Sequence, residues 1–261
     1  MRGCSGCARR GKKSMIASLA TAIHPMFEPT LLIVDCAVSP ASGAVFPDAI
    51  ARLSPPRLTS RFVRVANAPA ESIARIGAGP VPEALLITGS EAGVGDRLDW
   101  VSCLSRTLRP LLEAGVPTLG ICFGHQFIAD AFGGRVETPA PGVKTRGVRR
   151  VRVQPQGAAA LGRSGPIDVL VSHRDHVVEP PPGWSCIATS NYCAIQALMA
   201  PDLPITTVQW HPEANRAFIE DNPEPDSEHP WNQLDDPLLL GLPGADVLKR
   251  FLRRQSGFAR S

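Results

Sequence analysis

The sequence predicts an α/β fold: a mostly parallel open sheet flanked by helices, with a small antiparallel patch in the C-terminal half. Two observations support this prediction. From Leu31 onward, apolar runs of strand length alternate with segments that carry a helical stripe, an order typical of parallel sheets. After residue 147 the expected strands become short and closely spaced, which indicates antiparallel pairing beside the parallel sheet.

The first three strands are recognised by their hydrophobic patterns. Residues 31–38 form an apolar run with β-branched side chains, broken only by Asp35, as in a strand buried on both faces. Residues 61–68 alternate between apolar and polar side chains, and residues 84–90 form an apolar run that ends in a Gly-Ser turn. We expect these segments to be neighbouring strands of the parallel sheet.

A helix, a strand and a second helix are expected next. Apolar side chains recur at helical spacing through residues 100–114, and Gly115 closes that stripe. Residues 117–122 predict a fourth strand, and residues 125–132 predict a helix that ends at Gly133.

The second half is richer in strands. Five are expected, at 147–154, 167–172, 186–190, 195–199 and 205–210. Residues 245–254 predict a closing helix. Residues 221–237 are acidic and contain four prolines, so we expect a surface loop there.

The basic charge lies mainly at the N-terminal end. Five of the 27 basic residues fall within residues 1–27, which contain no acid, so the remainder carries slightly more acidic than basic residues. A strongly basic, nucleic-acid-binding domain is therefore excluded for the residues after 27. We expect residues 1–29 to form a flexible basic head, either a transit peptide or a mis-assigned start, ahead of one domain at 30–255.

Cysteine usage and hydropathy bear on location. Seven cysteines, an odd number in a chain of 261 residues, favour a reducing, cytoplasmic compartment over a disulfide framework, with organellar import by residues 1–27 left open. Cys4 and Cys7 have no second pair of ligands nearby, so we expect no metal site. No apolar run approaches the roughly 18 residues of a membrane helix, so we expect no membrane partner.

The sharpest motif is Gly-Ile-Cys-Phe-Gly at 120–124, between the fourth expected strand and the following helix. This is the pattern of a nucleophile elbow, in which flanking glycines allow strand and helix to approach around a strained residue. Cys122 would face a helix N-terminus, whose free N–H groups favour a thiolate and can stabilise an oxyanion. A buried core cysteine is the alternative, and the two glycines make it less favoured.

A candidate base follows the last sheet strand. His211 lies at its expected end, where open α/β sheets gather their ligand sites, and Glu213 follows after Pro212. If Pro212 keeps the segment extended, the carboxylate and imidazole share one side and can pair. Cys122, His211 and Glu213 then form a Cys–His–Glu set. An α/β-hydrolase shares the elbow but places its acid before its histidine.

These motifs resemble the class I, triad-type glutamine amidotransferases, in particular stand-alone domains similar to the amidotransferase part of GMP synthase. The resemblance covers about half of the chain. Its matching segments are ITGS (87–90), PTLGICFGHQFIADAFGG (117–134), VSHRDHVV (171–178) and VQWHPE (208–213). The ITGS turn departs from the Gly-Gly-Pro loop common in synthetase-linked members. The resemblance implies a flavodoxin-like sheet.

The resemblance also implies residue roles. Cys122 would form a γ-glutamyl thioester, His211 would transfer protons, and Glu213 would orient His211. The N–H groups of Gly89 and Phe123 would form the oxyanion hole. The substrate-binding residues would be Gln126, Ser172 and His173.

Two functions and one silent alternative remain open. The favoured function is glutamine hydrolysis that releases ammonia, with no cofactor. These 261 residues contain no P-loop motif, so we expect the ammonia to pass to a separate synthetase. The second is a γ-glutamyl peptidase, which needs the same thioester. A catalytically silent binding module is disfavoured by the intact Cys–His–Glu set.

Overall fold

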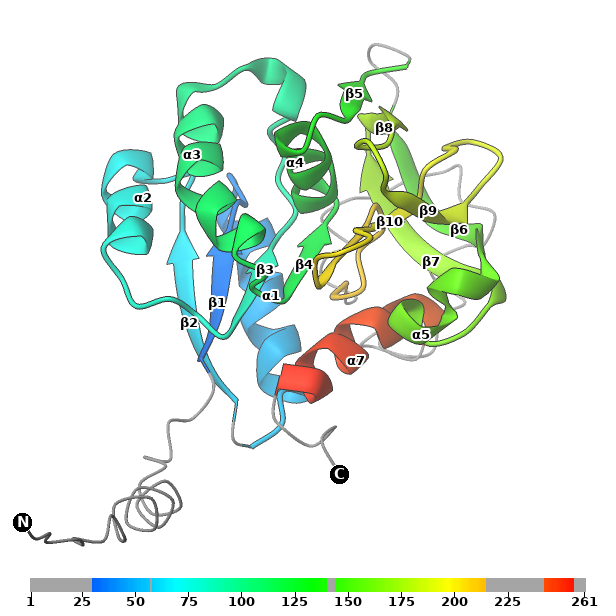
Figure 1. The fold of residues 1–261 in the computed structure, drawn as a ribbon, viewed down its shortest axis with the longest axis horizontal. Coiled ribbons are helices and arrows are strands. Elements are labelled where there is room, and N and C mark those ends of the chain that lie inside the picture. The colour runs from blue at the N-terminus through cyan, green and yellow to red at the C-terminus, as the bar shows by residue number, and fades with distance from the viewer. Residues whose placement is uncertain (1–29, 57, 140–143, 215–241, 256–261) are drawn as a thin grey trace, which may run out of the picture.

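The computed structural model describes residues 30–56, 58–139, 144–214 and 242–255. Its main feature is a nine-stranded mixed sheet in the order β2-β1-β3-β4-β11-β10-β9-β6-β7 (Figure 1). The strands of this sheet are β1 (Thr30–Asp35), β2 (Thr59–Arg64), β3 (Ala84–Ile87), β4 (Thr118–Ile121), β6 (Thr145–Val153), β7 (Gly165–His173), β9 (Ser185–Thr189), β10 (Ala197–Met199) and β11 (Ile205–Val208). A separate two-stranded sheet pairs β5 (Arg135–Glu137) with β8 (His176–Glu179).

The predicted fold class is confirmed. Strands β2, β1, β3, β4 and β11 pair in parallel, as buried apolar runs joined by long crossovers should. From β11 onward the pairing is antiparallel, through β10, β9, β6 and β7. The antiparallel strands thus extend the same sheet, and β11 lies where parallel pairing changes to antiparallel pairing.

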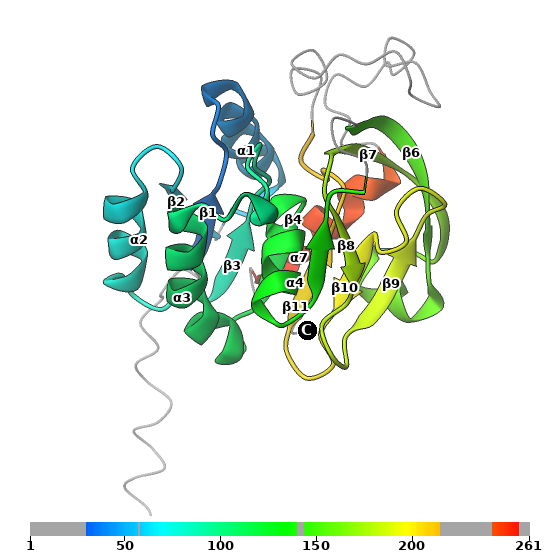
Figure 2. The ribbon, with the colours of Figure 1, turned by 90° about the horizontal axis from the view of Figure 1, so that it is seen from above.

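Helices cover both faces of the sheet. They are α1 (Pro40–Leu53), α2 (Pro69–Gly77), α3 (Asp99–Glu113), α4 (Phe123–Ala131), the short α5 (Ala158–Leu161) and α7 (Asp246–Gln255). In Figure 2, the strands β1 and β3 lie between α1 on one side and α2 and α3 on the other. Short 3-10 turns at Val94–Asp96, Pro155–Gly157 and Pro243–Ala245 complete the described elements.

The two faces hold separate cores, because successive side chains of a strand point to opposite faces. Leu31 and Ile33 of β1 pack in the cluster that includes Phe46 of α1 and Leu248 of α7. Their neighbours Leu32 and Val34 pack in the cluster of α2, α3 and α4. Both faces of β1 are therefore buried, which agrees with the uninterrupted apolar run at 31–34.

Three helices are absent from the sequence-based prediction: the four-residue α5, and the longer α1 and α2. Helix α1 begins at Pro40 and contains Pro47, and proline inside a helix removes a backbone hydrogen bond. Helix α2 has only nine residues, between Pro69 and Gly77. Intrinsic helix propensity is weak in both, so burial of side chains such as Ile50 and Ile73 against the sheet stabilises them instead.

Some predictions lie outside the described residues, namely those on residues 1–29, including Cys4 and Cys7, and on the loop at 221–237. Among the residues that are described, no helix is long and apolar enough to cross a membrane.

Candidate active site

Cys122 occupies a strained turn between β4 and α4. Its backbone has φ 50° and ψ −101°, and apart from Arg97 no other described non-glycine residue has a positive φ. Such a conformation costs on the order of 1–3 kcal/mol and persists only where the surroundings enforce it. Here the amide of Cys122 donates to the carbonyl of Val208 (2.9 Å), and its carbonyl accepts from Gln126 N (3.1 Å).

The glycines of the elbow allow the close approach that the motif predicts. A Cβ on Gly120 would lie 2.7 Å from the carbonyl oxygen of Gly124. A Cβ on Gly124 would overlap the carbonyl oxygen of Ile87 at the end of β3. Strand β4, helix α4 and strand β3 are therefore packed backbone against backbone beneath Cys122.

His211 and Glu213 meet, although by a different local geometry from the one expected. The Nδ1 atom of His211 lies 2.7 Å from Oε1 of Glu213. Strand β11 ends at Val208, and a turn at 212–213 brings the carboxylate beside the ring. The amide of His211 donates to Leu170 O of β7 (2.8 Å), and the indole of Trp210 donates to Gly244 O (2.9 Å). These contacts fix the turn against the sheet.

The electrostatic surroundings favour the protonated ring of His211. Burial by itself lowers the pKa of this imidazole, but the charges of Glu213 and Cys122 and hydrogen bonds to both raise it to about 10. With 8% of His211 and 2% of Glu213 exposed, water screens this interaction little. At neutral pH the imidazole therefore holds a proton that it can donate.

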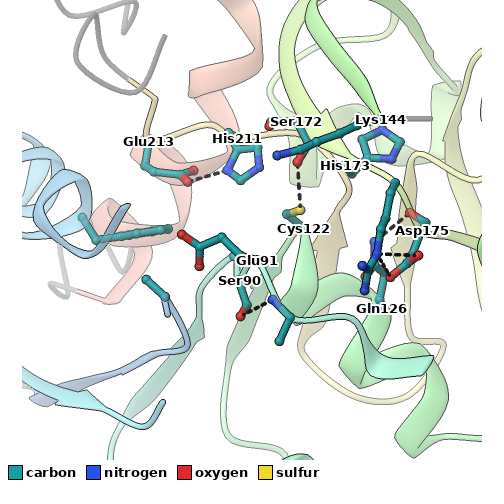
Figure 3. A pocket seen from close by; sticks show the side chains of 15 residues that line it. Ser90, Glu91, Cys122, Gln126, Lys144, Ser172, His173, Asp175, His211 and Glu213 are labelled. Carbon is teal, nitrogen blue, oxygen red and sulfur yellow. Dashed lines mark hydrogen bonds and ion pairs between the residues drawn. The ribbon is translucent and has the colours of Figure 1, made fainter. Parts of the chain in front are cut away.

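Cys122, His211 and Glu213 line one pocket of about 220 Å³ at the carboxyl ends of the parallel strands. Figure 3 shows Cys122 among the lining residues, with the ring of His211 between Cys122 and Glu213 (Figure 3). Cys122 is only 4% exposed, so the pocket is the route to its sulfur. In the part of the chain that the structure describes, no group of three or more His, Cys, Asp or Glu side chains could hold a metal ion.

Of the two expected oxyanion donors, Gly89 lines the pocket, and Phe123 directly follows Cys122. Gly89 follows β3, and a Cβ there would lie 3.0 Å from Cε1 of His211 and 3.6 Å from Cβ of Cys122. Phe123 is the first residue of α4, so its N–H has no acceptor within its own helix.

We expect Gly89→Ala to lower the glutamine hydrolysis that the sequence resemblance implies by about 100-fold, the scale of loss when a reacting group moves by about 1 Å. The added methyl group needs the space next to the His211 ring, so the ring must shift. The measurement is ammonia release at saturating glutamine. Gly95→Ala in the same loop is the control, because nothing lies within 4 Å of its added Cβ. A wild-type rate in Gly89→Ala would show that the close approach of Gly89 to the ring has no functional value.

Ser172 and His173 end strand β7 at the pocket wall. The carbonyl of Ser172 lies 3.8 Å from the Cys122 sulfur. The His173 ring packs edge-on against His176, with centroids 4.9 Å apart. Burial, followed by the positive charges of His176 and His211, lowers the pKa of His173 well below its usual range, so its ring is neutral at pH 7.

The side chain of Gln126 also lies at the pocket, with its amide nitrogen bonded to protein atoms. That nitrogen donates to Asp175 O (2.8 Å) and to Oε1 of Gln209 (3.2 Å). The amide nitrogen of Gln209 in turn lies 3.7 Å from the sulfur of Cys122. Sequence reasoning missed Gln209, because only the register of β11 against β4 reveals its position beside Cys122.

Two contacts at the pocket rim were also missed. Glu91 accepts hydrogen bonds from Val38 N (2.8 Å) and Ser39 Oγ (2.7 Å), which join two loops at the carboxyl ends of β1 and β3. Arg174 forms an ion pair with Asp96, in which Nη2 lies 2.8 Å from each carboxylate oxygen. A hydrogen bond from Gly93 N, together with Arg174, lowers the pKa of Asp96. No pattern in the sequence singles out these partners.

A family model, glutamine amidotransferase class-I, matches residues 54–220. Among curated proteins, the chain is 34% identical over 134 residues to a subunit of the glutamine-hydrolyzing GMP synthase of Archaeoglobus fulgidus, covering 51% of this chain and 70% of that protein. It is 33% identical over 132 residues to the glutamine-hydrolyzing GMP synthase of Thermus thermophilus. That match spans 51% of this chain but only a quarter of the bacterial protein.

Solved structures share the fold. A glutamine amidotransferase from Methylobacillus flagellatus superimposes with a TM-score of 0.61 at 23% identity, covering 89% of this chain and 93% of that one. A glutamine amidotransferase from Thermotoga maritima gives 0.63 at 17% identity, covering 88% and 97%. At these identities the likeness concerns the fold alone.

Proposed function

Because the chain belongs to the class-I glutamine amidotransferase family, we propose that it hydrolyses the side-chain amide of glutamine with a Cys122–His211–Glu213 triad. One observation carries the assignment. His211, whose Nδ1 lies 2.7 Å from Glu213 Oε1, lines the same pocket as the strained Cys122. Nucleophile, proton carrier and orienting carboxylate are the three parts that covalent acyl transfer requires.

The first half of the reaction forms the thioester. The Cys122 thiolate, its proton held on His211, attacks the side-chain carbonyl carbon of glutamine. The negative charge that develops on the carbonyl oxygen is stabilised by the N–H groups of Gly89 and Phe123. The C–N bond then breaks, the His211 imidazolium gives its proton to the departing nitrogen, and ammonia leaves.

The second half regenerates the enzyme. Neutral His211 removes a proton from water, the hydroxide attacks the thioester, and the same N–H groups hold the second oxyanion. The C–S bond breaks to give glutamate and the Cys122 thiolate, with the proton again on His211. Glu213 stays ionised throughout and keeps Nε2 of the ring directed toward the sulfur. Ser172 and His173 at the pocket wall would contact the amino-acid end of the substrate, and Gln126 would support the loop that carries them.

We further propose that the ammonia passes to a separate acceptor synthetase. The name of the Archaeoglobus fulgidus relative supports this arrangement, since it designates one subunit of a GMP synthase. Glutamine hydrolysis by the isolated chain should then be slow. It should rise at least about tenfold when the synthetase component of a GMP synthase is added, a coupling of roughly 1.4 kcal/mol.

We expect the purified chain to release ammonia and glutamate from glutamine. With the synthetase component present, kcat/KM for glutamine should exceed that for glutathione, a γ-glutamyl peptide. Both products are measured in the absence of ATP and of the acceptor substrate, so that no ammonia is consumed and the two should appear in equal amounts. The same assay without the added synthetase is the control.

Two results would contradict the proposal. Efficient turnover of glutathione with only trace turnover of glutamine would establish a γ-glutamyl peptidase. No turnover of either substrate, with and without the synthetase component, would leave a binding module.

A further inference from the structure

Gln209 lies beside the candidate nucleophile because of strand register. Strands β4 and β11 pair in parallel with Ile121 opposite Val208, so the next residues of the two strands, Cys122 and Gln209, are neighbours. Gln209 is completely buried, and its backbone N–H donates to the backbone carbonyl of Gln196 at 2.8 Å. Its backbone is therefore held in place, and its side chain has little freedom.

The hydrogen bonds around Gln209 determine which end of its amide faces the sulfur. The carbonyl of Asp175 can only accept, so it must face the nitrogen of Gln126, 2.8 Å away. The second N–H of Gln126 then needs an acceptor, and Oε1 of Gln209 provides it at 3.2 Å. This leaves the NH₂ group of Gln209 directed at the Cys122 sulfur, at 3.7 Å.

Such a donor acts differently on the two forms of the sulfur. The thiol can donate to Ser172 O, 3.8 Å away, and this contact ceases to be a hydrogen bond once the proton leaves. The contact from Gln209 becomes charge-assisted at the same moment, and hydrogen bonds to charged groups are about twice as strong as neutral ones. Gln209 itself is completely buried, so water does not compete with it for this contact.

We propose that Gln209 is a catalytic residue that stabilises the Cys122 thiolate through its side-chain N–H and aims the sulfur at the substrate. Gln126 and Asp175 O act behind it as positioning groups that hold its amide in the donating orientation. This inference rests on the proposed role of Cys122 as nucleophile.

The test is the pH dependence of Cys122 alkylation by iodoacetamide, read by mass spectrometry of the Cys122 peptide, which requires no turnover. Gln209→Met keeps the length of the side chain and removes the donor. Gln209→Glu keeps its shape and replaces NH₂ by oxygen. In both variants the midpoint of the alkylation profile should rise by about one to two pH units, as loss of a charge-assisted hydrogen bond predicts. The kcat for glutamine should fall about 10- to 100-fold, with KM within about threefold.

Gln196→Met is the matched control. Gln196 is also fully buried, but its side-chain nitrogen donates to Ser190 Oγ, so its loss should leave the midpoint unchanged. An unmoved midpoint in folded Gln209→Glu and Gln209→Met would overturn the inference, even if kcat falls. That result leaves the proposed function standing, because the proposed function is tested separately, by the turnover of glutamine against glutathione and by the activity of Cys122→Ala.

Discussion

Cys122→Ala is expected to lower glutamine hydrolysis by a factor of about 10⁴ or more, the scale of loss when a covalent nucleophile is removed. No other described cysteine lines the pocket, so none can take its place. The measurement is ammonia release at an enzyme concentration high enough to detect a residual rate of about one part in 10⁴.

The fold should survive this change. Alanine removes one sulfur atom and keeps the Cβ, so the strain at φ 50° is the same in both proteins. The melting temperature should therefore stay within a few degrees of wild type. Cys103→Ala, at a half-buried site on α3, should keep full activity. A Cys122→Ala protein that still turns over glutamine at more than a few per cent of the wild-type rate would contradict the thioester mechanism.

Glu213→Gln should lower kcat about 10²- to 10⁴-fold, because an amide can present an N–H to His211 Nδ1 and favour the wrong tautomer. The variant also removes the charge that holds the proton on the ring. The measurement is kcat across pH 6 to 10. Glu113→Gln on the exposed face of α3, where Glu113 pairs with Arg109, is the control and should leave kcat unchanged.

The pairing of His211 with Glu213 also makes the free energy of unfolding depend on pH. The ordinary pKa of histidine is about 6.5, and the folded chain raises that of His211 to about 10. Below pH 6.5 both folded and unfolded chains hold the proton, so the stabilisation from the pair is fully present. Between pH 6.5 and 10 only the folded chain holds it, and the stabilisation is lost as the pH rises through that range.

Urea unfolding at several pH values tests this dependence. The wild type should exceed Glu213→Gln most in free energy of unfolding near pH 6.5, and the difference should shrink by pH 9.5. A difference that stays constant over this range would mean that His211 is neutral in the folded protein. Glu113→Gln should show no such trend.

Local patterns made the elbow predictable from the sequence. An apolar strand, a cysteine flanked by glycines and a helix start are consecutive in the chain, and Gly120 and Gly124 are required by the contacts that they make. The pairing of His211 with Glu213 was also accessible, because the two residues are close in sequence. The turn that joins them was not, since it depends on contacts with Leu170 and Gly244.

Features that depend on long-range pairing were hidden. Strand β11 could be recognised as a strand, yet nothing local indicates that it lies between β4 and β10. The position of Gln209 follows from that placement, as do the loop contacts of Glu91. Helix α1 was missed because its prolines oppose helix formation, and packing of Phe46 and Ile50 against the sheet outweighs them.

The central place of β11 also bears on the order of folding. Strand β4 and the elbow are synthesised about 87 residues before their partner strand, and closing so long a loop is entropically costly and slow. Until β11 arrives, one edge of β4 has no partner strand, and exposed edges invite pairing with other chains. The same strand brings His211 and Glu213, so the reactive cysteine gains its proton acceptor only when the sheet closes. A nascent chain would thus carry no activated thiol, and hydrolysis would begin only once folding is complete.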